Sequence, residues 1–275
     1  MKTSMQLNAL VRNLSKKNNI NAEIILRNYM FERLLERVAL SEYQKNFILK
    51  GGVLISAIVG IDTRTTLDLD ATIQGHELNR TQVESLFKEI INVNIDDNIV
   101  FTFLKIEEIH EESDYPCYRV SCEARLEKTR QTLKIDITSG DSITPREIEF
   151  SYKLMFEDRT INLLAYSLET VLAEKIEGIL TRGETNTRMR DFYDVYIITK
   201  TQTDKYSKEI FKTALRNTAQ KRNTLNVINK ASDILRVIER SSEMIELWQQ
   251  YLKNNPYAAN TSWDDVIKAV ISLIN

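Results

Sequence analysis

The hydrophobic periodicity of the chain changes twice, and these changes limit the folds that the chain can adopt. Residues 3–47 repeat apolar side chains at helical spacing, whereas alternation of apolar and polar side chains dominates from residue 48 to about residue 165. Within this middle part a helical pattern returns at 79–92, and the clearest alternation runs through 118–126. From Ser167 the pattern is helical to the end of the chain. The sequence therefore predicts an α+β protein with helices before and after a sheet.

Nothing in the composition separates these parts by a linker. We find no Pro/Gly-rich stretch, internal repeat or low-complexity tract. At 275 residues and 32.0 kDa the chain can form one large domain or two modest ones. We expect two domains, residues 1–165 and residues 166–275, whose boundary is a change of secondary structure.

The composition also predicts a cellular compartment. Hydrophobic residues make up 43% and charged residues 28%, as in an ordinary globular protein. The chain has no apolar run long enough to span a bilayer, and its first residues, MKTSMQLNAL, lack the apolar core of a signal peptide. Cys117 and Cys122 have an odd spacing, which on a strand points them to opposite faces and disfavours a disulfide. We therefore expect a cytoplasmic protein without membrane contact.

The scarcity of histidine disfavours several kinds of site. The chain contains only His76 and His110, each far from any cysteine, so neither a zinc site of ordinary spacing nor a Ser-His-Asp or Cys-His nucleophile is expected. The net charge of -2 and the pI near 5.9 argue against a surface coated with basic residues for duplex binding. A local basic patch is compatible with both values.

The segment LKGGVLISAIVGIDTRTTLDLDATI, residues 49–73, combines a glycine pair with two carboxylates. Gly51 and Gly52 precede a short predicted helix, where glycines let a phosphate approach backbone N–H groups. Asp68 and Asp70 share one face of a predicted strand, and their mutual repulsion favours a hard divalent cation with oxygen ligands. The segment therefore predicts binding of a metal–polyphosphate complex.

Each half of this segment alone has a simpler explanation, a solvated strand face for the aspartates and a turn for the glycines. A third carboxylate favours the functional interpretation. Asp136 lies in LKIDIT on the strand face that it shares with Lys134 and Thr138. Two-metal sites commonly use three carboxylates, of which one comes from a neighbouring strand. The sequence therefore predicts Asp136 beside Asp68 and Asp70.

Charged side chains on two predicted helices of the carboxyl-terminal part need partners. Lys175 lies on the apolar stripe of SLETVLAEKIEGIL, where a lysine either extends to solvent at the edge or meets an anion. In the next helix Asp191 and Asp194 are three residues apart and share one face. Arg188 and Arg190 are close enough in sequence to pair with them, so a helix-stabilising salt bridge stays open for at least one aspartate.

The combination of these segments resembles the AbiEii-type nucleotidyltransferase toxins, the enzyme half of bacterial type IV toxin–antitoxin and phage abortive-infection systems. The resemblance covers nearly the whole chain, through LKGGVLISAIVGIDTRTTLDLD, KIDITSGDSITP, ETVLAEKIEGILTRGETNTRMRDFYDVY and the tail around SWDDVI. The order GG…DxD, AEK, RDFYD is its specific part. It implies a polymerase-beta-like nucleotidyltransferase core with a mixed sheet, preceded by N-terminal helices and followed by a helical C-terminal domain.

The resemblance also implies roles for individual residues. The residues that it assigns to nucleotide binding are Gly51, Gly52, Arg64, Thr66 and Lys175. Those that it assigns to catalysis are Asp68, Asp70, Lys175 and Asp191, with Asp194 and Arg190 beside them. Asp68, Asp70 and Asp136 are the implied ligands of Mg²⁺ or Mn²⁺. Many related enzymes carry a small hydroxyl residue after the glycines, where this chain has Val53, so the phosphate contact there is expected from backbone groups alone.

The implied function is transfer of a nucleotide from an NTP to RNA, such as the end of a tRNA, with growth arrest or phage abortive infection as the outcome. The implied partners are the NTP, the RNA and a cognate antitoxin encoded nearby, with or without direct contact. Candidate RNA contacts, each also explicable as a solvated helix face, are Arg182, Arg188, Arg190, Lys212, Arg216, Lys221 and Arg222. Two other classes stay open: an enzyme of the same fold that modifies protein or hydrolyses nucleotide, and a nucleotide-binding regulator without turnover.

Overall fold

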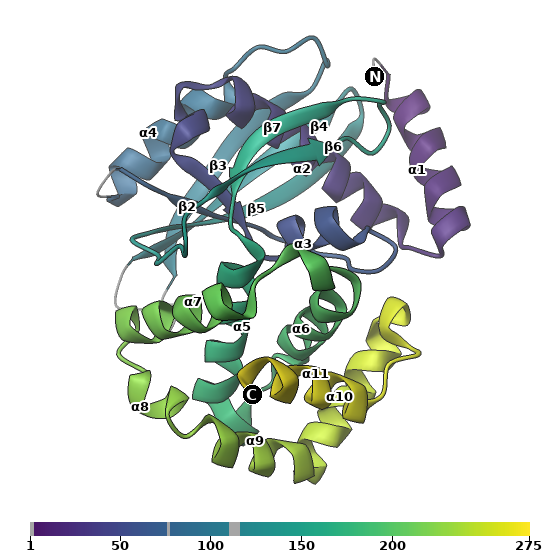
Figure 1. The fold of residues 1–275 in the computed structure, drawn as a ribbon. Coiled ribbons are helices and arrows are strands. Elements are labelled where there is room, and N and C mark those ends of the chain that lie inside the picture. The colour runs from purple at the N-terminus through teal and green to yellow at the C-terminus, as the bar shows by residue number, and fades with distance from the viewer. Residues whose placement is uncertain (1–2, 76–77, 110–115) are drawn as a thin grey trace. The chain divides into compact units, whose positions relative to one another are not determined.

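The computed structural model describes residues 3–75, 78–109 and 116–275, which form two compact units (Figure 1). His76 and His110 lie outside the described residues. One unit contains residues 1–140 and 148–165, and the other contains residues 141–147 and 166–275. The loop 141–147 belongs to the second unit because Thr144 is held there: its backbone N–H donates to Thr170 at 2.9 Å, and its hydroxyl accepts from Asn217 at 3.0 Å.

The first unit is a mixed sheet with helices, which confirms the predicted α+β class. Within the described residues the sheet has seven strands in the order β3-β4-β5-β2-β1-β7-β6. β1 pairs parallel with β7, β2 pairs parallel with β5, and the other neighbours are antiparallel. The strands are β1 Phe47–Lys50, β2 Leu69–Ile73, β3 Val100–Ile109, β4 Cys117–Leu126, β5 Thr129–Ser139, β6 Ile148–Lys153 and β7 Thr160–Ala165. The helices are α1 Ser4–Asn18, α2 Ala22–Leu40, η1 Glu42–Lys45, α3 Gly51–Val59 and α4 Arg80–Ile91.

Local signals in the sequence account for several of these boundaries. The helix predicted at 79–92 is α4, which Asn79 begins with a capping box. The helical pattern of 3–47 is interrupted because Asn19 adopts a left-handed conformation and Asn21 caps the next helix. Cys117 and Cys122 are both buried on β4 and form no disulfide, as the sequence predicts.

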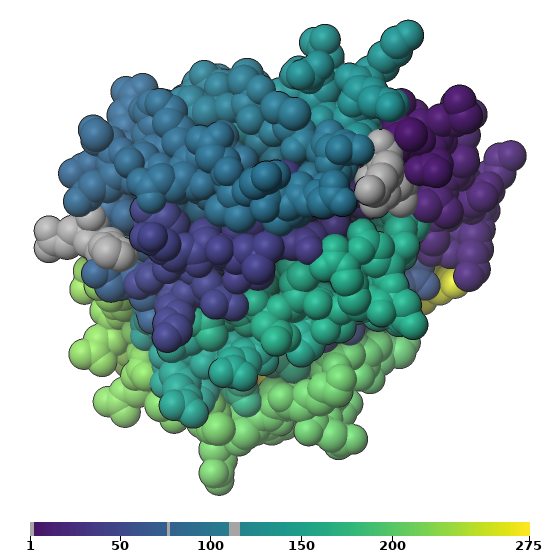
Figure 2. Space-filling view, turned by 90° about the horizontal axis from the view of Figure 1, so that it is seen from above, coloured from purple at the N-terminus to yellow at the C-terminus, as the bar shows by residue number. Residues whose placement is uncertain are grey.

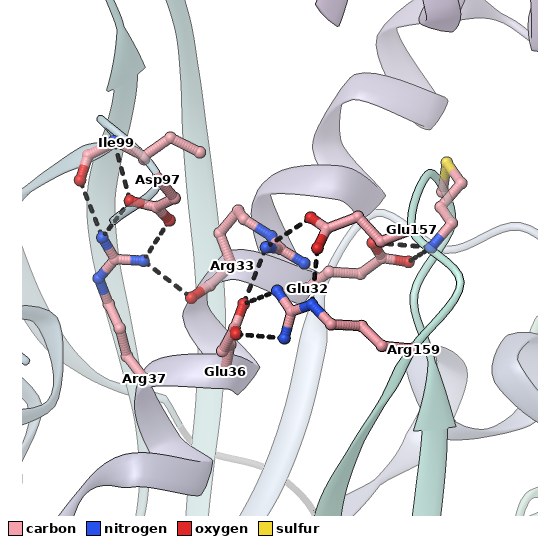
Figure 3. Close-up of polar contacts among 9 residues, drawn as sticks. Glu32, Arg33, Glu36, Arg37, Asp97, Ile99, Glu157 and Arg159 are labelled. Atoms are coloured by element: carbon pink, nitrogen blue, oxygen red, sulfur yellow. Dashed lines mark hydrogen bonds and ion pairs between the residues drawn. The ribbon is translucent and has the colours of Figure 1, made fainter. Parts of the chain in front are cut away.

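Helix α2 buries charged side chains that its sequence pattern places between the apolar ones (Figure 3). Arg37 donates to both carboxylate oxygens of Asp97, at 2.8 and 2.9 Å. Arg159, from the loop between β6 and β7, donates to both oxygens of Glu36 at 2.5 and 3.0 Å. α2 also contacts β5 and β7, so its polar face meets protein in place of water. These ion pairs join α2 to the loop before β3 and to the β6–β7 hairpin.

Glu32 is the most deeply buried acid of this network. It is 2% exposed, and its carboxylate accepts the backbone N–H of Met155 at 3.0 and 3.1 Å. Burial raises the pKa of Glu32 from 4.5 to about 8, although the hydrogen bond from Met155 and the charge of Arg33 oppose the rise.

The glycine pair forms the first turn of α3, directly after β1. Gly51 has a φ of +64°, and a Cβ at this position would lie 1.9 Å from Oδ2 of Asp70. A Cβ on Gly52 would lie 2.5 Å from Oγ1 of Thr66 and 3.2 Å from Nη2 of Arg64. Both positions require glycine because other side chains of the segment already occupy the space.

The second unit is helical throughout its described secondary structure. Its helices are α5 Leu168–Arg182, η2 Gly183–Thr185, α6 Met189–Thr201, η3 Thr203–Lys205, α7 Lys208–Lys221, α8 Leu225–Ile228, α9 Ala231–Arg240, α10 Ser242–Asn254, η4 Pro256–Ala258 and α11 Trp263–Ile274. Ser167 caps α5 as predicted. The aromatic core of the second unit includes Trp263. Its ring centroid lies 5.3 Å from that of Phe192 and 6.2 Å from that of Trp248. In the described ranges we find no helix with the length and apolar character needed to cross a membrane.

Replacing Gly51 by alanine tests the close contact with Asp70. An alanine with positive φ costs roughly 1–2 kcal/mol, and crowding against a side chain adds roughly 1–3 kcal/mol. Gly183→Ala is the matched control, because Gly183 has a φ of +55° and a Cβ there meets nothing within 4 Å. We expect urea unfolding to show a larger loss for Gly51→Ala than for Gly183→Ala. Equal losses would mean that the contact with Asp70 has no energetic consequence.

Replacing Glu32 by glutamine tests the raised pKa. Between the unfolded pKa near 4.5 and the folded pKa of about 8, the folded state binds more protons, so stability falls as pH rises through this window. Glutamine has no proton to lose and keeps an oxygen for the Met155 N–H. We expect Glu32→Gln to flatten the decline of Tm between pH 5 and pH 8, whereas the exposed control Glu149→Gln keeps it. An unchanged decline in Glu32→Gln would show that Glu32 is ionised in the folded protein.

Candidate functional site

Four charged residues form a row across the centre of the sheet in the first unit. In the strand registers Lys50 of β1 lies opposite Asp70 of β2, Asp70 lies opposite Asp136 of β5, and Asp136 lies opposite Arg119 of β4. Residues directly opposite each other on neighbouring strands share one face of a sheet. The predicted pairing of Asp70 with Asp136 on one face is therefore present, with a cation at each end of the row.

The sequence prediction missed both cations of this row, Lys50 and Arg119. Nε and Nη2 of Arg119 donate to Oδ1 and Oδ2 of Asp136 at 2.8 and 2.7 Å. These hydrogen bonds raise the pKa of Arg119 against the opposing effect of its partial burial, and the charges of Asp136 and Asp68 add to the rise. The bidentate pair balances the carboxylate of Asp136, which is 6% exposed.

Asp70 contacts the amino terminus of α3. Its Oδ2 accepts the backbone N–H of Gly52 at 3.2 Å. The first N–H groups of a helix lack partners within the helix, and the positive end of the helix dipole lies there, so a carboxylate is stabilised at this place. Asp68 lies in a bend one residue before β2 begins, instead of within the strand, and both aspartates are half-buried. The segment thus brings a helix amino terminus and two partly accessible carboxylates together.

The carboxylates of this row are the candidates for a metal site. Hard oxygen donors such as those of Asp68 and Asp70 are the ligands that Mg²⁺ prefers. As the chain stands, the ranges 3–75, 78–109 and 116–275 hold no group of three or more His, Cys, Asp or Glu residues arranged to bind a metal ion. Asp68 and Asp70 fit a divalent cation by their chemistry, whereas both carboxylate oxygens of Asp136 accept hydrogen bonds from Arg119. The three-carboxylate site therefore stays a prediction.

Arg64 and Thr66 lie behind the glycine pair. They are 1% and 4% exposed. Arg64 donates from its guanidinium to the Thr65 carbonyl and accepts from the Ser56 hydroxyl through its own carbonyl at 2.7 Å, while the Thr66 hydroxyl donates to the Asp68 carbonyl at 3.1 Å. Both side chains, predicted as nucleotide contacts, pack beside Gly52 in the first turn of α3, and Thr66 also contacts the bend that carries Asp68.

In the second unit an ion triad joins α5 and α6. Nζ of Lys175 lies 2.6 Å from Oδ1 of Asp191 and 3.2 Å from Oδ2 of Asp194. The side chain of Lys175 is 19% exposed, whereas that of Asp194 is fully buried. The partner of the two aspartates is thus Lys175, and Arg188 and Arg190 are exposed without an ion pair among the described residues. Lys175, on the apolar stripe of α5, therefore contacts two carboxylates, which is one of the two outcomes that its position allows.

Some of the candidate RNA contacts on the helices have structural partners. Arg222 donates to Glu177 at 2.7 Å and to Glu174 at 2.9 Å, so it fastens the end of α7 to α5. Arg182 donates to the carbonyl of Gly178 at 3.0 Å. Of these candidates, Arg188, Arg190 and Arg216 are exposed and have no ion pair among the described residues.

Comparison with solved structures supports a nucleotidyltransferase fold. A structure from H. pylori described as that of a candidate nucleotidyltransferase matches with a TM-score of 0.50 and 15% sequence identity, over 91% of this chain and 94% of that chain. The structure of JHP933 from Helicobacter pylori matches with a TM-score of 0.50 and 14% identity, over 91% of each chain. At these identities the likeness concerns the fold alone. A search of curated proteins gave no match.

A family model provides the closer assignment. It is described as "Nucleotidyl transferase AbiEii toxin, Type IV TA system", and it matches residues 33–269. This range includes the glycine pair, the row of charged residues on the sheet and the Lys175 triad. The chain belongs to the AbiEii nucleotidyltransferase toxin family of type IV toxin–antitoxin systems.

Proposed function

We propose that this nucleotidyltransferase transfers a nucleotide from an NTP to an RNA acceptor in a Mg²⁺-dependent reaction. The observation that carries the proposal is the contact between the first turn of α3 and Asp70, where glycine is required at two consecutive positions. A helix amino terminus without side chains attracts phosphate, and an adjacent carboxylate attracts the cation that accompanies phosphate. A type IV toxin–antitoxin family implies an antitoxin partner. Growth arrest or phage abortive infection in the cytoplasm is the proposed outcome.

Each group of the site has a proposed task. The backbone N–H groups of the first turn of α3 bind the phosphates, and Asp68, Asp70 and Asp136 would hold Mg²⁺ or Mn²⁺. When bound, the cation would neutralise phosphate charge and lower the pKa of the acceptor hydroxyl. For Lys175 of the second unit we propose phosphate binding, with Asp191 and Asp194 holding its ammonium group.

Labelling with each radioactive NTP separates the proposal from its alternatives. Purified protein incubated with total RNA and Mg²⁺ is expected to label RNA and to release pyrophosphate in equal amount. Label on protein would indicate a transferase of the same fold with another acceptor, and free nucleotide without labelled polymer would indicate hydrolysis. Binding without any product would indicate a regulator.

Replacing Asp70 by asparagine separates the charge of Asp70 from its shape. The asparagine oxygen still accepts the Gly52 N–H, and the loss of repulsion from Asp136 offsets the loss of charge at the helix amino terminus. We expect transfer to fall at least about 100-fold, with stability within about 1 kcal/mol of the parent. The exposed Asp204→Asn variant is the control and should retain activity. A fully active Asp70→Asn enzyme would contradict the assignment of Asp70 to the metal.

Lys175 needs a more careful test, because it balances two aspartates. Lys175→Ala would strand the carboxylates of Asp191 and Asp194 without their cation, so the structure predicts a loss of up to roughly 3 kcal/mol in stability, more than the sequence alone suggests. The triple variant Lys175→Met/Asp191→Asn/Asp194→Asn removes all three charges together. We expect a thermal melt close to that of the parent, with weakened triphosphate binding in calorimetry and no transfer. Retention of activity by the folded triple variant would show that the triad is structural only, and Lys205→Ala is the exposed control.

A further inference from the structure

A solvent-open cavity of about 690 Å³ lies in the first unit beside the candidate site. Its walls come from α1, the first two turns of α2, the amino-terminal half of β5 and the residues before β2. α1 is held beside this part of β5, since the Asn8 side chain donates to the Thr129 hydroxyl at 3.2 Å and Ser4 donates to Glu127 at 2.6 Å. Figure 2 shows α1, in the darkest purple, at the margin of the unit. Of the residues that line this cavity, Asp68 alone has a role assigned above.

The cavity carries an excess of positive charge. Its lining includes the four cations Arg12, Arg27, Arg130 and Lys134, against the two acids Glu23 and Asp68. Arg27 pairs with Glu23 at 2.8 Å, and Arg130 approaches Glu123, outside the cavity, only to 4.0 Å. Arg12 and Lys134 are exposed and have no ion pair within the described part of the chain. An excess of unpaired cations around a hollow favours an anionic ligand.

The strand register places this cavity on the other side of Asp68 from the glycine pair. β2 begins with Leu69, opposite Ile135, so residues 129–134 of β5 extend past the start of β2. The cavity occupies this region and includes Asp68 in its wall. Across β2 lie β1 and α3, which carry the glycine pair. Asp68 and Asp70 thus lie between the glycine pair, which is the proposed site of the NTP phosphates, and the positively charged cavity.

Strand β5 connects the cavity with the row of charged residues, because Lys134 lines the cavity and Asp136 belongs to the row. Lys134 and Asp136 are two residues apart on one strand, so they share a face and lie about 7 Å apart along it. Val11, Leu26 and Leu67 add apolar surface to the lining, and Leu67 is 44% exposed. Basic side chains can bind the phosphates of a strand, and these aliphatic side chains can pack against a base.

From this placement we propose that the cavity binds the acceptor strand, with Arg12 and Lys134 on the phosphates next to the hydroxyl that receives the nucleotide. The inference rests on the proposed function, since it takes the glycine pair as the place of the NTP phosphates. It assigns acceptor binding to the amino-terminal helix and β5, instead of to the basic side chains of the second unit. The occupant is a single-stranded RNA end, because the charged wall suits consecutive phosphates and the cavity volume suits one or two nucleotides.

Direct binding of RNA tests this inference without requiring transfer. The variant Arg12→Gln/Lys134→Gln removes two exposed cations of the cavity, and Lys16→Gln/Lys17→Gln on the same helix removes two exposed cations outside its lining. The probe is a short fluorescent oligoribonucleotide with a free 3′ hydroxyl, titrated by anisotropy at several salt concentrations. Loss of two phosphate contacts makes the line of log K against log salt less steep, by about 1.4 in the slope. It also weakens binding at least about tenfold. We expect both effects in the cavity variant and neither in the control.

Calorimetry with a non-hydrolysable NTP identifies which ligand the cavity holds. The cavity variant is expected to bind the NTP like the parent. Loss of NTP affinity with unchanged RNA affinity would overturn the inference and assign the cavity to the nucleotide. Equal RNA binding by the cavity variant and the control, or no RNA binding by the parent, would also overturn it. Weakened RNA binding by the cavity variant supports the assignment of the cavity to RNA, even if the labelling experiment detects no transfer. The two proposals can therefore fail separately.

Discussion

The packing of Asp70 against the first turn of α3 is the constraint on which the rest of the first unit depends. The carboxylate fills the space where Gly51 lacks a side chain, and it accepts the N–H of Gly52. This contact fixes the position of α3 relative to β2, and β2 in turn fixes Asp70 opposite Asp136. The glycine pair and the aspartates, about fifteen residues apart in sequence, are therefore one structural feature. The same feature leaves a helix amino terminus beside two half-buried carboxylates, which is the arrangement from which phosphate and metal binding are proposed.

Opposite charges flank the carboxylates on the sheet. Two carboxylates side by side on neighbouring strands repel each other, and the row places Lys50 and Arg119 at their outer sides. In the second unit the carboxylates are balanced differently, because the single Lys175 of α5 pairs with both Asp191 and Asp194 of α6. In both cases an ionisable group suited to chemistry is also a partner in a buried ion pair. Neutral variants that remove whole pairs are therefore more informative than single truncations.

The sequence predicts those features that depend on short-range order. Hydrophobic periodicity gives the α4 helix, the β4 strand and the helical second unit, and alternation places Asp70 and Asp136 on matching faces. The pairing of Arg119 with Asp136 was also predictable. A two-residue turn joins β4 to β5, so counting back seven residues from Leu126 and forward seven from Thr129 reaches this pair. The buried charges of α2 were not predictable in this way, because their partners Asp97 and Arg159 come from segments about 60 and 120 residues later in the chain. The cavity beside β5 likewise depends on where α1 returns to the sheet.

The most direct measurement is a crystal structure of the protein with Mg²⁺ and a non-hydrolysable NTP. The account predicts phosphate oxygens on the backbone N–H groups of the first turn of α3, with Asp68 and Asp70 on the cation. It also predicts that the cavity lined by Arg12 and Lys134 remains free of nucleotide. A triphosphate bound elsewhere, with the Gly52 N–H still donating to Asp70 and no cation on either aspartate, would contradict the central claim.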